Sequence, residues 1–369
     1  MDDKIKILIS GGGTGGHIFP AISIANALRS KHPSVEILFV GADNRMEMEK
    51  VPAAGYEIIG LPVSGFDRSR LINNVRVAGR LLKSLVKARK IVRDFKPDVA
   101  VGVGGYASGP VLWAAASGGI PTVIQEQNCY AGVTNKLLCR RASSVCVAYD
   151  GLERFFPADK LVLTGNPVRQ DLCNPEITRG EAVRFFGLDP SRKVILIIGG
   201  SLGARTINES VSAALPELPS DIQLIWQTGK NFEQKAGQMM KEKEGVSRQP
   251  FIARMDMAYR AADLVISRAG ASSISELCLL EKPVILVPSP NVAEDHQTRN
   301  AVALEEKGAA LIVKDTDAPG KLIGLAVETV RDTALLERLS ANIALLAQRD
   351  SAFRIAEIIL QVVKEKKKK

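Results

Sequence analysis

Short runs of β-branched and aliphatic residues alternate along the chain with longer segments whose apolar positions have helical spacing. Several runs contain almost no polar residue, which is typical of strands buried on both faces of a sheet. After the first run, Ile18, Ile22, Ala25 and Leu28 fall on one face of a helix. This strand–helix rhythm predicts a doubly wound parallel sheet. The predicted strands are 5–9, 36–40, 99–103, 122–124, 144–147, 193–198, 223–226, 264–267, 283–288 and 310–313.

A turn-rich cluster, Thr164 to Pro167, interrupts the rhythm before it restarts at residue 193. The chain has 369 residues, which suits two domains at about 100–200 residues each. We therefore expect an N-terminal domain over residues 1–167 and a C-terminal domain over 168–349. A last helix within 350–369 is expected to join the N-terminal domain through an apolar stripe at Ile355, Ile358, Ile359 and Val362.

Glycine-rich turns follow the first strand of each half. Gly11 to Gly16 reads GGGTGG, and a second turn runs from Gly199 to Arg205. Glycine lets the backbone approach a phosphate, and a helix N-terminus adds N–H groups and a positive dipole end. Small or polar residues also occupy the junctions at 104–109 and 270–273. These turns are expected at the carboxyl edges of the two sheets, where α/β folds bind ligands.

These loops are compatible with more than one class of protein. The first loop satisfies the dinucleotide fingerprint GxGxxG, and Asp43 lies near the end of the second strand, so an NAD-dependent oxidoreductase is one alternative. A non-catalytic nucleotide-sugar-binding adaptor at a membrane is another. A P-loop is excluded, because His17 and Ile18 follow the last glycine in place of Lys and Ser or Thr.

The formal net charge of +9 favours a polyanion or an anionic membrane surface as a partner. Ten cations, against the single acid Asp94, lie between Arg68 and Lys96. This segment predicts either a helix that lies in a membrane interface or a surface helix that packs on its own core. The candidates for its apolar stripe are Leu71, Val75, Ala78, Leu82, Leu85 and Ile91.

Cysteine usage and the N-terminus bear on the compartment. Five cysteines without a CxxC pair, together with three histidines, argue against a disulfide framework and a metal centre. The N-terminus lacks the basic region and long apolar core of a signal peptide, and no apolar run approaches the length of a membrane span. These features predict a protein of the reducing cytoplasm.

Seven motifs follow one another along nearly the whole chain, at 11–20, 104–110, 126–128, 165–169, 199–205, 272–276 and 295–297. This ordered set resembles glycosyltransferase family 28, whose members add N-acetylglucosamine to an undecaprenyl-linked muramyl pentapeptide in peptidoglycan synthesis. The resemblance implies a GT-B fold, with two doubly wound Rossmann-like domains facing each other across a cleft. The acceptor would bind the N-terminal half and the donor mainly the C-terminal half.

The resemblance also implies an activity. It implies inverting transfer from UDP-N-acetylglucosamine to the C4 hydroxyl of the muramyl sugar in the lipid-linked acceptor, lipid I. The expected place is the cytoplasmic face of the bacterial inner membrane, with peripheral attachment to its anionic surface. No cofactor and no nucleic-acid partner are expected. A related transferase that glycosylates another lipid is the close alternative.

Candidate catalytic residues lie in the N-terminal half. His17 begins a helix directly after the first loop, where an imidazole can accept the proton of an attacking hydroxyl. Glu126 is the competing base, or else a hydrogen-bonded loop carboxylate. The chain has Gln125 where the family often has His, and an amide cannot act as a base. The expected acceptor-binding residues are Gly104, Gly105 and Tyr106.

On the donor side, the resemblance makes Glu276 the acceptor of both ribose hydroxyls, although an acid in the first turn of a helix is also a routine dipole partner. Ser201 and Arg169 are expected at the diphosphate, and Ile252 is expected to read the uracil through backbone groups. The other expected donor contacts are Thr14, Gly15, Gly16, Asn128, Ala271, Ser272, Ser273 and Gln297.

Asp315-Thr316-Asp317 spells DxD, which is a metal–nucleotide motif in other glycosyltransferases. It directly precedes Ala318-Pro319-Gly320, so the sequence predicts a solvated turn and no metal. Helix N-termini and Arg169 are expected to stabilise the charge of the leaving group instead.

Overall fold

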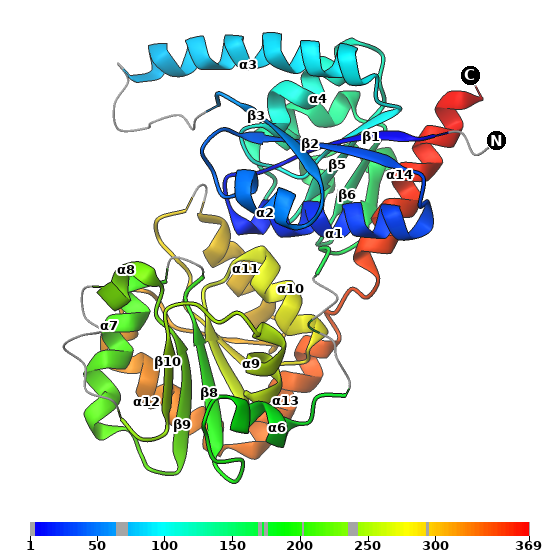
Figure 1. Ribbon diagram of the computed structural model, residues 1–369. Helices are drawn as coiled ribbons and strands as arrows, with labels where there is room; N and C mark the ends of the chain where they lie inside the picture. Colours follow the sequence, from blue (N-terminus) through cyan, green and yellow to red (C-terminus); the bar gives the residue numbers. More distant parts are fainter. Residues whose placement is uncertain are drawn as a thin grey trace. The chain divides into compact units, whose positions relative to one another are not determined.

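The computed structural model describes residues 4–63, 73–168, 172, 176–200, 203–234, 243–292 and 295–368, and of residues 73–78 it describes the backbone. Contacts divide the chain into two compact units. Unit 1 consists of Met1–Arg169 together with Arg349–Lys369, and unit 2 of Gln170–Gln348. Each unit is an α/β domain with helices on both faces of a parallel sheet (Figure 1).

The sheet of unit 1 has seven parallel strands in the order β3-β2-β1-β4-β5-β6-β7. Successive side chains of its central strand, β1, point to opposite faces of the sheet, as they do along any strand. Ile7 and Ile9 pack into the core on one face, and Leu8 packs into the core on the other. The strands are β1 Lys6–Ser10, β2 Glu36–Ala42, β3 Glu57–Leu61, β4 Val99–Gly102, β5 Thr122–Glu126, β6 Ser144–Val147 and β7 Leu161–Leu163.

Different helices cover the two faces of this sheet (Figure 1). One core contains α1 and α14, and the other contains α3 and α4. Ile355 and Ile359 of α14 are fully buried there, which contributes about 1.5–3 kcal/mol for each side chain. The last helix of the chain therefore returns to unit 1. The helices of unit 1 are α1 Gly15–Lys31, α2 Glu47–Ala53, α3 Asn73–Phe95, α4 Ser108–Ser117, α5 Val133–Leu138 and α14 Ser351–Lys367.

The sheet of unit 2 has six parallel strands in the order β10-β9-β8-β11-β12-β13. Its strands are β8 Lys193–Ile198, β9 Ile222–Gln227, β10 Val246–Gln249, β11 Leu264–Ser267, β12 Val284–Leu286 and β13 Leu311–Ile312. One face packs on α7 and α12 around the fully buried Trp226. The helices of unit 2 are α6 Arg179–Phe185, α7 Arg205–Ala214, α8 Lys230–Phe232, α9 Met255–Ala261, α10 Ala271–Leu279, α11 His296–Glu305, α12 Ala318–Arg331 and α13 Thr333–Ala344.

The predicted fold class, two doubly wound parallel α/β domains, is confirmed. Each predicted strand is present with ends that differ by at most two residues from those expected. The structure adds β3, β7 and β10, which the sequence pattern did not predict. All three lie at the edge of a sheet.

The predicted single apolar stripe on α3 is wrong. Leu82 is 65% exposed whereas Ile91 is buried, and nine residues at about 100° each place the two side chains on opposite sides of a helix. The inner face is formed by Ser84, Ala88 and Ile91. Leu71 and the side chains of Val75 and Ala78 lie outside the described part of the chain.

Among the residues that the structure describes, no helix combines the length and the apolar character that crossing a bilayer requires.

Candidate functional site

Unit 1 has a topological switch point between β1 and β4. These strands are neighbours, yet the helices that follow them, α1 and α4, cover opposite faces of the sheet. The two connections therefore diverge at the carboxyl ends of the strands, and ligands of α/β folds bind in the crevice that forms there. The glycine loop before α1 and the Gly104-Gly105 turn are these two connections.

The two connections pack closely against each other. Gly104 and Gly105 have φ values of 89° and 84°, a region that glycine adopts without strain. A Cβ on Gly105 would overlap the backbone of Gly12, and a Cβ on Gly104 would press on the ring of His17. Tyr106 follows directly and is 58% exposed. The predicted acceptor residues therefore lie beside the predicted base.

Glu47 holds the first glycine loop in place. Its carboxylate is fully buried, and Oε1 accepts from the amides of Gly13 at 3.0 Å and Ala42 at 2.9 Å. A Cβ on Gly12 would overlap this carboxylate. The Gly13 amide thus already has an anionic partner from the protein itself, which disfavours the dinucleotide interpretation of this loop. Asp43 packs over Gly60 of β3.

His17 lies in the first turn of α1 and is partly exposed. Its Nδ1 is 3.2 Å from the carbonyl oxygen of Gly12 and 3.2 Å from Oγ1 of Thr14. A carbonyl oxygen only accepts, so the contact with Gly12 places the proton of the neutral ring on Nδ1. Nε2 is then the basic nitrogen. Gly15 and Gly16 belong to the same helical turn.

Glu126 ends β5 as a buried loop carboxylate. Oε1 accepts from the amide and the side chain of Asn128, and Oε2 accepts from the amide of Gly132 at 2.9 Å and from Asn135 Nδ2 at 2.8 Å. Burial raises the pKa of this carboxyl above its usual value, while these hydrogen bonds oppose the shift. The geometry favours the loop-carboxylate interpretation over the catalytic base.

Buried amides connect β5 to the segment that leaves unit 1. Gln125 is fully buried, and its Nε2 donates to Asn166 Oδ1 at 2.9 Å. Gln127 Nε2 donates to Gln125 and to the carbonyl of Val103, and Asn166 Nδ2 donates to the carbonyl of Gln127. Gln125 therefore has a structural place in this network.

Unit 2 repeats the switch point between β8 and β11. The glycine loop that begins at Gly199 follows β8, and the segment Arg268–Gly270 follows β11 and leads into α10. Close packing explains two of its glycines. A Cβ on Gly199 would overlap Ala204, and one on Gly203 would overlap the carbonyl of Thr228. Ser201 and Arg169, which the resemblance places at the diphosphate, lie outside the described residues.

Glu276 is in the second turn of α10, whose first turn contains Ala271, Ser272 and Ser273. The buried Tyr259 donates its hydroxyl to Glu276 Oε2 at 2.8 Å. A carboxylate accepts several hydrogen bonds at once, so this contact orients Glu276 and is compatible with the binding of a diol. Sequence reasoning missed Tyr259, because only the fold brings α9 beside α10.

Two more predicted donor residues form hydrogen bonds with neighbouring segments of unit 2. Ile252 is buried, and its amide donates to Oε1 of Gln227 at 3.0 Å. Gln297, in the first turn of α11, accepts through Oε1 from the amide of Ser289 at 2.8 Å. Gln227 was not singled out by the sequence pattern.

The interpretation of the DxD motif as a solvated turn is wrong for its first acid. Asp315 Oδ1 pairs with Arg268 Nη1 at 2.6 Å, and Oδ2 accepts from Thr206 at 2.9 Å. Asp317 instead pairs with the exposed Lys321. In the described part of the chain, no cluster of three His, Cys, Asp or Glu side chains that could hold a metal is present. The motif therefore serves unit 2 as a structural ion pair.

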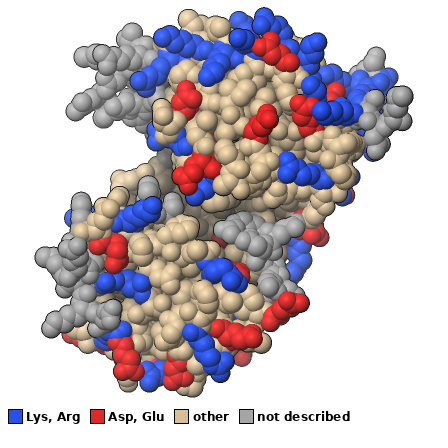
Figure 2. Space-filling view, viewed as in Figure 1, with Lys and Arg blue, Asp and Glu red and all other residues tan. Residues whose placement is uncertain are grey.

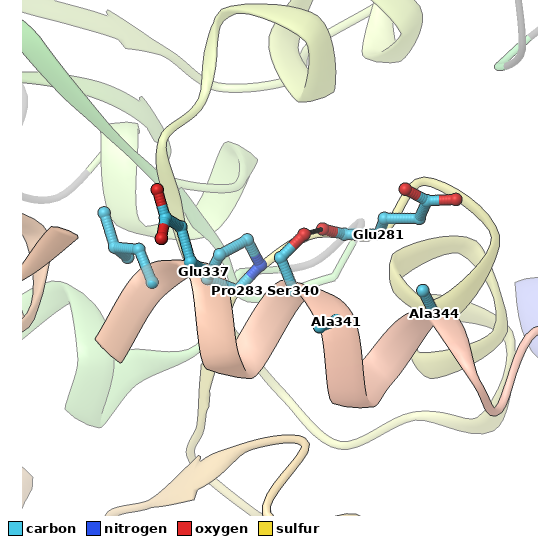
Figure 3. A pocket seen from close by; sticks show the side chains of 7 residues that line it. Glu281, Pro283, Glu337, Ser340, Ala341 and Ala344 are labelled. Carbon is cyan, nitrogen blue, oxygen red and sulfur yellow. Dashed lines mark hydrogen bonds between the residues drawn. The ribbon is translucent and has the colours of Figure 1, made fainter. Parts of the chain in front are cut away.

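A separate hollow of about 370 Å³ lies on unit 2 between α13 and the turn before β12 (Figure 3). Ser340 donates to the carbonyl of Glu281 across it. The hollow is at the amino-terminal end of β12, whereas the glycine loops follow the carboxyl ends of their strands. It is therefore distinct from the switch-point loops.

Two family models match the chain. The N-terminal domain of glycosyltransferase family 28 matches residues 7–147, and the C-terminal domain of the same family matches residues 194–365. Together these matches cover most of the chain, in the expected order.

The chain belongs to glycosyltransferase family 28.

Members of family 28 from several bacteria match this chain along its full length. A relative from Parabacteroides distasonis is 63% identical over 366 residues, which is 98% of this chain and 100% of the relative. A relative from Phocaeicola vulgatus is 60% identical over 372 residues, 100% of this chain and 99% of the relative. Both carry the name UDP-N-acetylglucosamine--N-acetylmuramyl-(pentapeptide) pyrophosphoryl-undecaprenol N-acetylglucosamine transferase.

Solved structures agree with the GT-B fold of family 28. The crystal structure of MurG from Acinetobacter baumannii matches with a TM-score of 0.76 and 29% identity, covering 97% of this chain and 100% of that one. The calicheamicin glycosyltransferase CalG4 matches with a TM-score of 0.73 at 15% identity, over 98% of this chain and 99% of that one. The second likeness concerns the fold alone.

Proposed function

We propose that this family 28 enzyme transfers N-acetylglucosamine from UDP-N-acetylglucosamine to the C4 hydroxyl of a muramyl pentapeptide carried on pyrophosphoryl-undecaprenol. The observation that carries the proposal is full-length identity of up to 63% to transferases with that name. The switch-point loops of the two units support it, since each unit then offers one ligand-binding edge.

Unit 2 binds the donor. Its glycine loop and the N-terminus of α7 receive the diphosphate, Glu276 accepts the ribose hydroxyls, and Ile252 reads the uracil. The Tyr259 hydroxyl supports this role of Glu276, because a carboxylate fixed by one strong hydrogen bond presents its oxygens in a defined direction. Ser201 and Arg169 are assigned to the diphosphate by the resemblance.

Unit 1 binds the acceptor and supplies the base. The acceptor oxygen attacks the anomeric carbon of the donor sugar, its bond to that carbon forms, and the bond from that carbon to UDP breaks. Nε2 of His17 takes the hydroxyl proton, and UDP leaves with the electron pair. The contact of Nδ1 with the Gly12 carbonyl supports this role, since it fixes the tautomer in which Nε2 is basic. A single displacement inverts the configuration at the anomeric carbon.

A lipid-linked acceptor requires the enzyme to work at a membrane surface, and α3 is the proposed docking element. Leu82 and Val86 are 65% and 60% exposed and lie one turn apart. Figure 2 shows Lys and Arg side chains gathered over this part of unit 1. Exposed aliphatic side chains among cations suit an anionic interface. The exposed cations of the described part of the helix are Arg80, Lys83, Lys87, Arg89, Lys90 and Arg93.

The proposal is tested by UDP release from UDP-N-acetylglucosamine in the presence and absence of a lipid I analogue. We expect release that depends on the acceptor. Binding of the nucleotide sugar without acceptor-dependent release would contradict the proposal and favour an adaptor. A fluorescence change on addition of NADH would favour the oxidoreductase alternative.

A further inference from the structure

Gln227, at the carboxyl end of β9, joins two loops that begin on different strands. Its Nε2 donates to the carbonyl of Gly200 in the glycine loop after β8, at 3.0 Å. Its Oε1 accepts from the amide of Ile252, just beyond β10, at 3.0 Å. The side chain is 5% exposed. One buried amide thus uses both its donor and its acceptor to fix the position of one loop relative to the other.

We propose that Gln227 is a positioning residue that sets which base the donor site accepts. The inference rests on the proposed function, in which these loops hold the diphosphate and the uracil. The amide of Ile252 is committed to Gln227, so base reading at Ile252 falls to its carbonyl oxygen, which only accepts. Uracil presents an N–H donor at N3, whereas cytosine presents an acceptor there. A carbonyl held in this place therefore selects uracil over cytosine.

The second hydrogen bond of Gln227 serves the diphosphate. A carbonyl oxygen that faced a phosphate would repel it, and the Gly200 oxygen is instead held by two donors, Nε2 of Gln227 and the amide of Gly203, each at 3.0 Å. Gly200 has a φ of 84°, and a Cβ there would meet no atom within 4 Å. The turn therefore has open space on its outer side, as close approach of a ligand requires.

Other contacts hold the same loops and would persist without Gln227. Gly229 donates to the carbonyl of Pro250 at 3.0 Å, and Thr228 donates to that of Gln249 at 2.9 Å. Asn208 Nδ2 donates to the Thr228 carbonyl at 2.7 Å. Loss of Gln227 should therefore loosen the loops without detaching them, so the effect appears in base selection more than in folding.

The test compares Gln227→Met with Gln223→Met. Gln223 is the matched control, because it is a buried glutamine of the same strand with the same number of side-chain hydrogen bonds. Its Nε2 donates to the carbonyl of Asp189, and its Oε1 accepts from the amide of Asp189. Affinities for UDP and CDP are measured by calorimetry. We expect Gln227→Met to bind UDP about tenfold more weakly, the equivalent of one or two net hydrogen bonds, and to prefer UDP over CDP less than the wild type does. Gln223→Met should match the wild type in both measurements.

A second variant keeps the test open if Gln227→Met does not fold. In Gln227→Glu, a protonated carboxyl can still donate to Gly200 and accept from Ile252, whereas a carboxylate can only accept. UDP affinity of this variant should therefore fall as the pH rises through the pKa of the new carboxyl. The wild-type curve is the control, because the two proteins share every other charged group near this site, including the Glu233–Arg248 ion pair.

Each outcome decides one question. If the wild type transfers the sugar but Gln227→Met retains the wild-type UDP affinity and base preference, the inference is wrong and the proposed function stands. A UDP affinity of Gln227→Glu that follows the wild-type curve at every pH also overturns the inference. A wild-type protein that does not bind UDP would overturn the proposed function itself.

Discussion

At the scale of single residues, a backbone carbonyl determines what His17 can do. Its Nδ1 faces the Gly12 oxygen, so the neutral ring keeps its basic nitrogen at Nε2. We predict that His17→Ala lowers kcat by about 10²–10⁴-fold, the usual contribution of a general base, and leaves UDP affinity unchanged. Steady-state kinetics together with UDP calorimetry check this. Turnover within a few-fold of the wild type would remove His17 from the mechanism.

Glu276 offers a binding prediction in the other unit. Its carboxylate is oriented by Tyr259 and is assigned to the ribose. Loss of hydrogen bonds to a charged group costs about 1.5–3 kcal/mol, so Glu276→Ala should weaken UDP binding by roughly 10–100-fold. Calorimetry measures the affinity for UDP, and Tyr259→Phe should lower this affinity by a smaller factor. Unchanged affinity would leave Glu276 only its structural contact with Tyr259.

Lys282 couples the stability of unit 2 to pH. Burial lowers the pKa of its ammonium to about 8, with Asp263 opposing the shift and Arg260 and Arg179 adding to it. Between pH 8 and the unfolded value near 10.5, the unfolded chain binds the extra proton, so the free energy of unfolding rises with pH in this window. Relative to Lys282→Met, the wild type should gain up to about 3 kcal/mol across it.

The check is urea unfolding of both proteins at several values of pH within that window. The two proteins share every other ionisable group, so the difference between them reports on Lys282. A constant difference between the proteins would show that Lys282 keeps its ordinary pKa in the fold.

Local motifs mark some candidate residues in the sequence, whereas residues that act through distant contacts have no such mark. Gly11 to Gly16 and His17 are adjacent in the chain, so one motif shows their relation. Glu47, in contrast, reaches the first loop from α2, 34 residues away, and Gln227 reaches the loop of Gly200 from another strand. A single buried Glu or Gln has no local pattern that reveals its partner.

At the scale of elements, the strands that the pattern predicted are those with apolar residues on both faces. The missed strands β3, β7 and β10 lie at sheet edges. β10 reads Val-Ser-Arg-Gln and β7 has only three residues, so neither shows the continuous apolar run of a central strand. A continuous apolar run was thus the signal: the edge strand β13 has one and was predicted, whereas β7 is too short and β10 too polar to show it.

Membrane docking by α3 is also a property of a whole element, because it depends on several exposed side chains acting together. We predict that Lys83→Glu with Lys87→Glu sharply weakens co-sedimentation with anionic vesicles. Each basic residue near such a surface contributes about 1 kcal/mol, and salt screens it. Leu82→Gln with Val86→Gln should weaken the salt-resistant part of the binding.

The control for the vesicle experiment is Lys230→Glu with Lys307→Glu, an equal change in charge at two exposed sites of unit 2. UDP affinity should be unchanged in every variant. If the α3 variants sediment as well as this control, α3 is not the docking surface.

At the scale of the whole molecule, the two units share one plan. Both sheets follow the strand order of a doubly wound fold, with the first and fourth strands of each unit adjacent. Both units carry glycine loops after those strands. The resemblance to family 28 implies that the acceptor binds the first unit and the donor mainly the second, with Thr14, Gly15 and Gly16 of the first loop as further donor contacts. The sequence indicated this duplication because each half opens with a strand and a glycine turn.

The central claim is that this chain makes one particular glycosidic bond. The most direct measurement is to incubate it with UDP-N-acetylglucosamine and a lipid I analogue, and to determine the mass and anomeric configuration of the lipid product. The account predicts a product heavier by one N-acetylglucosamine residue, joined at C4 of the muramyl sugar with the β configuration, inverted from the α configuration of the donor. An unmodified acceptor, or a product that retains the α configuration, would contradict it.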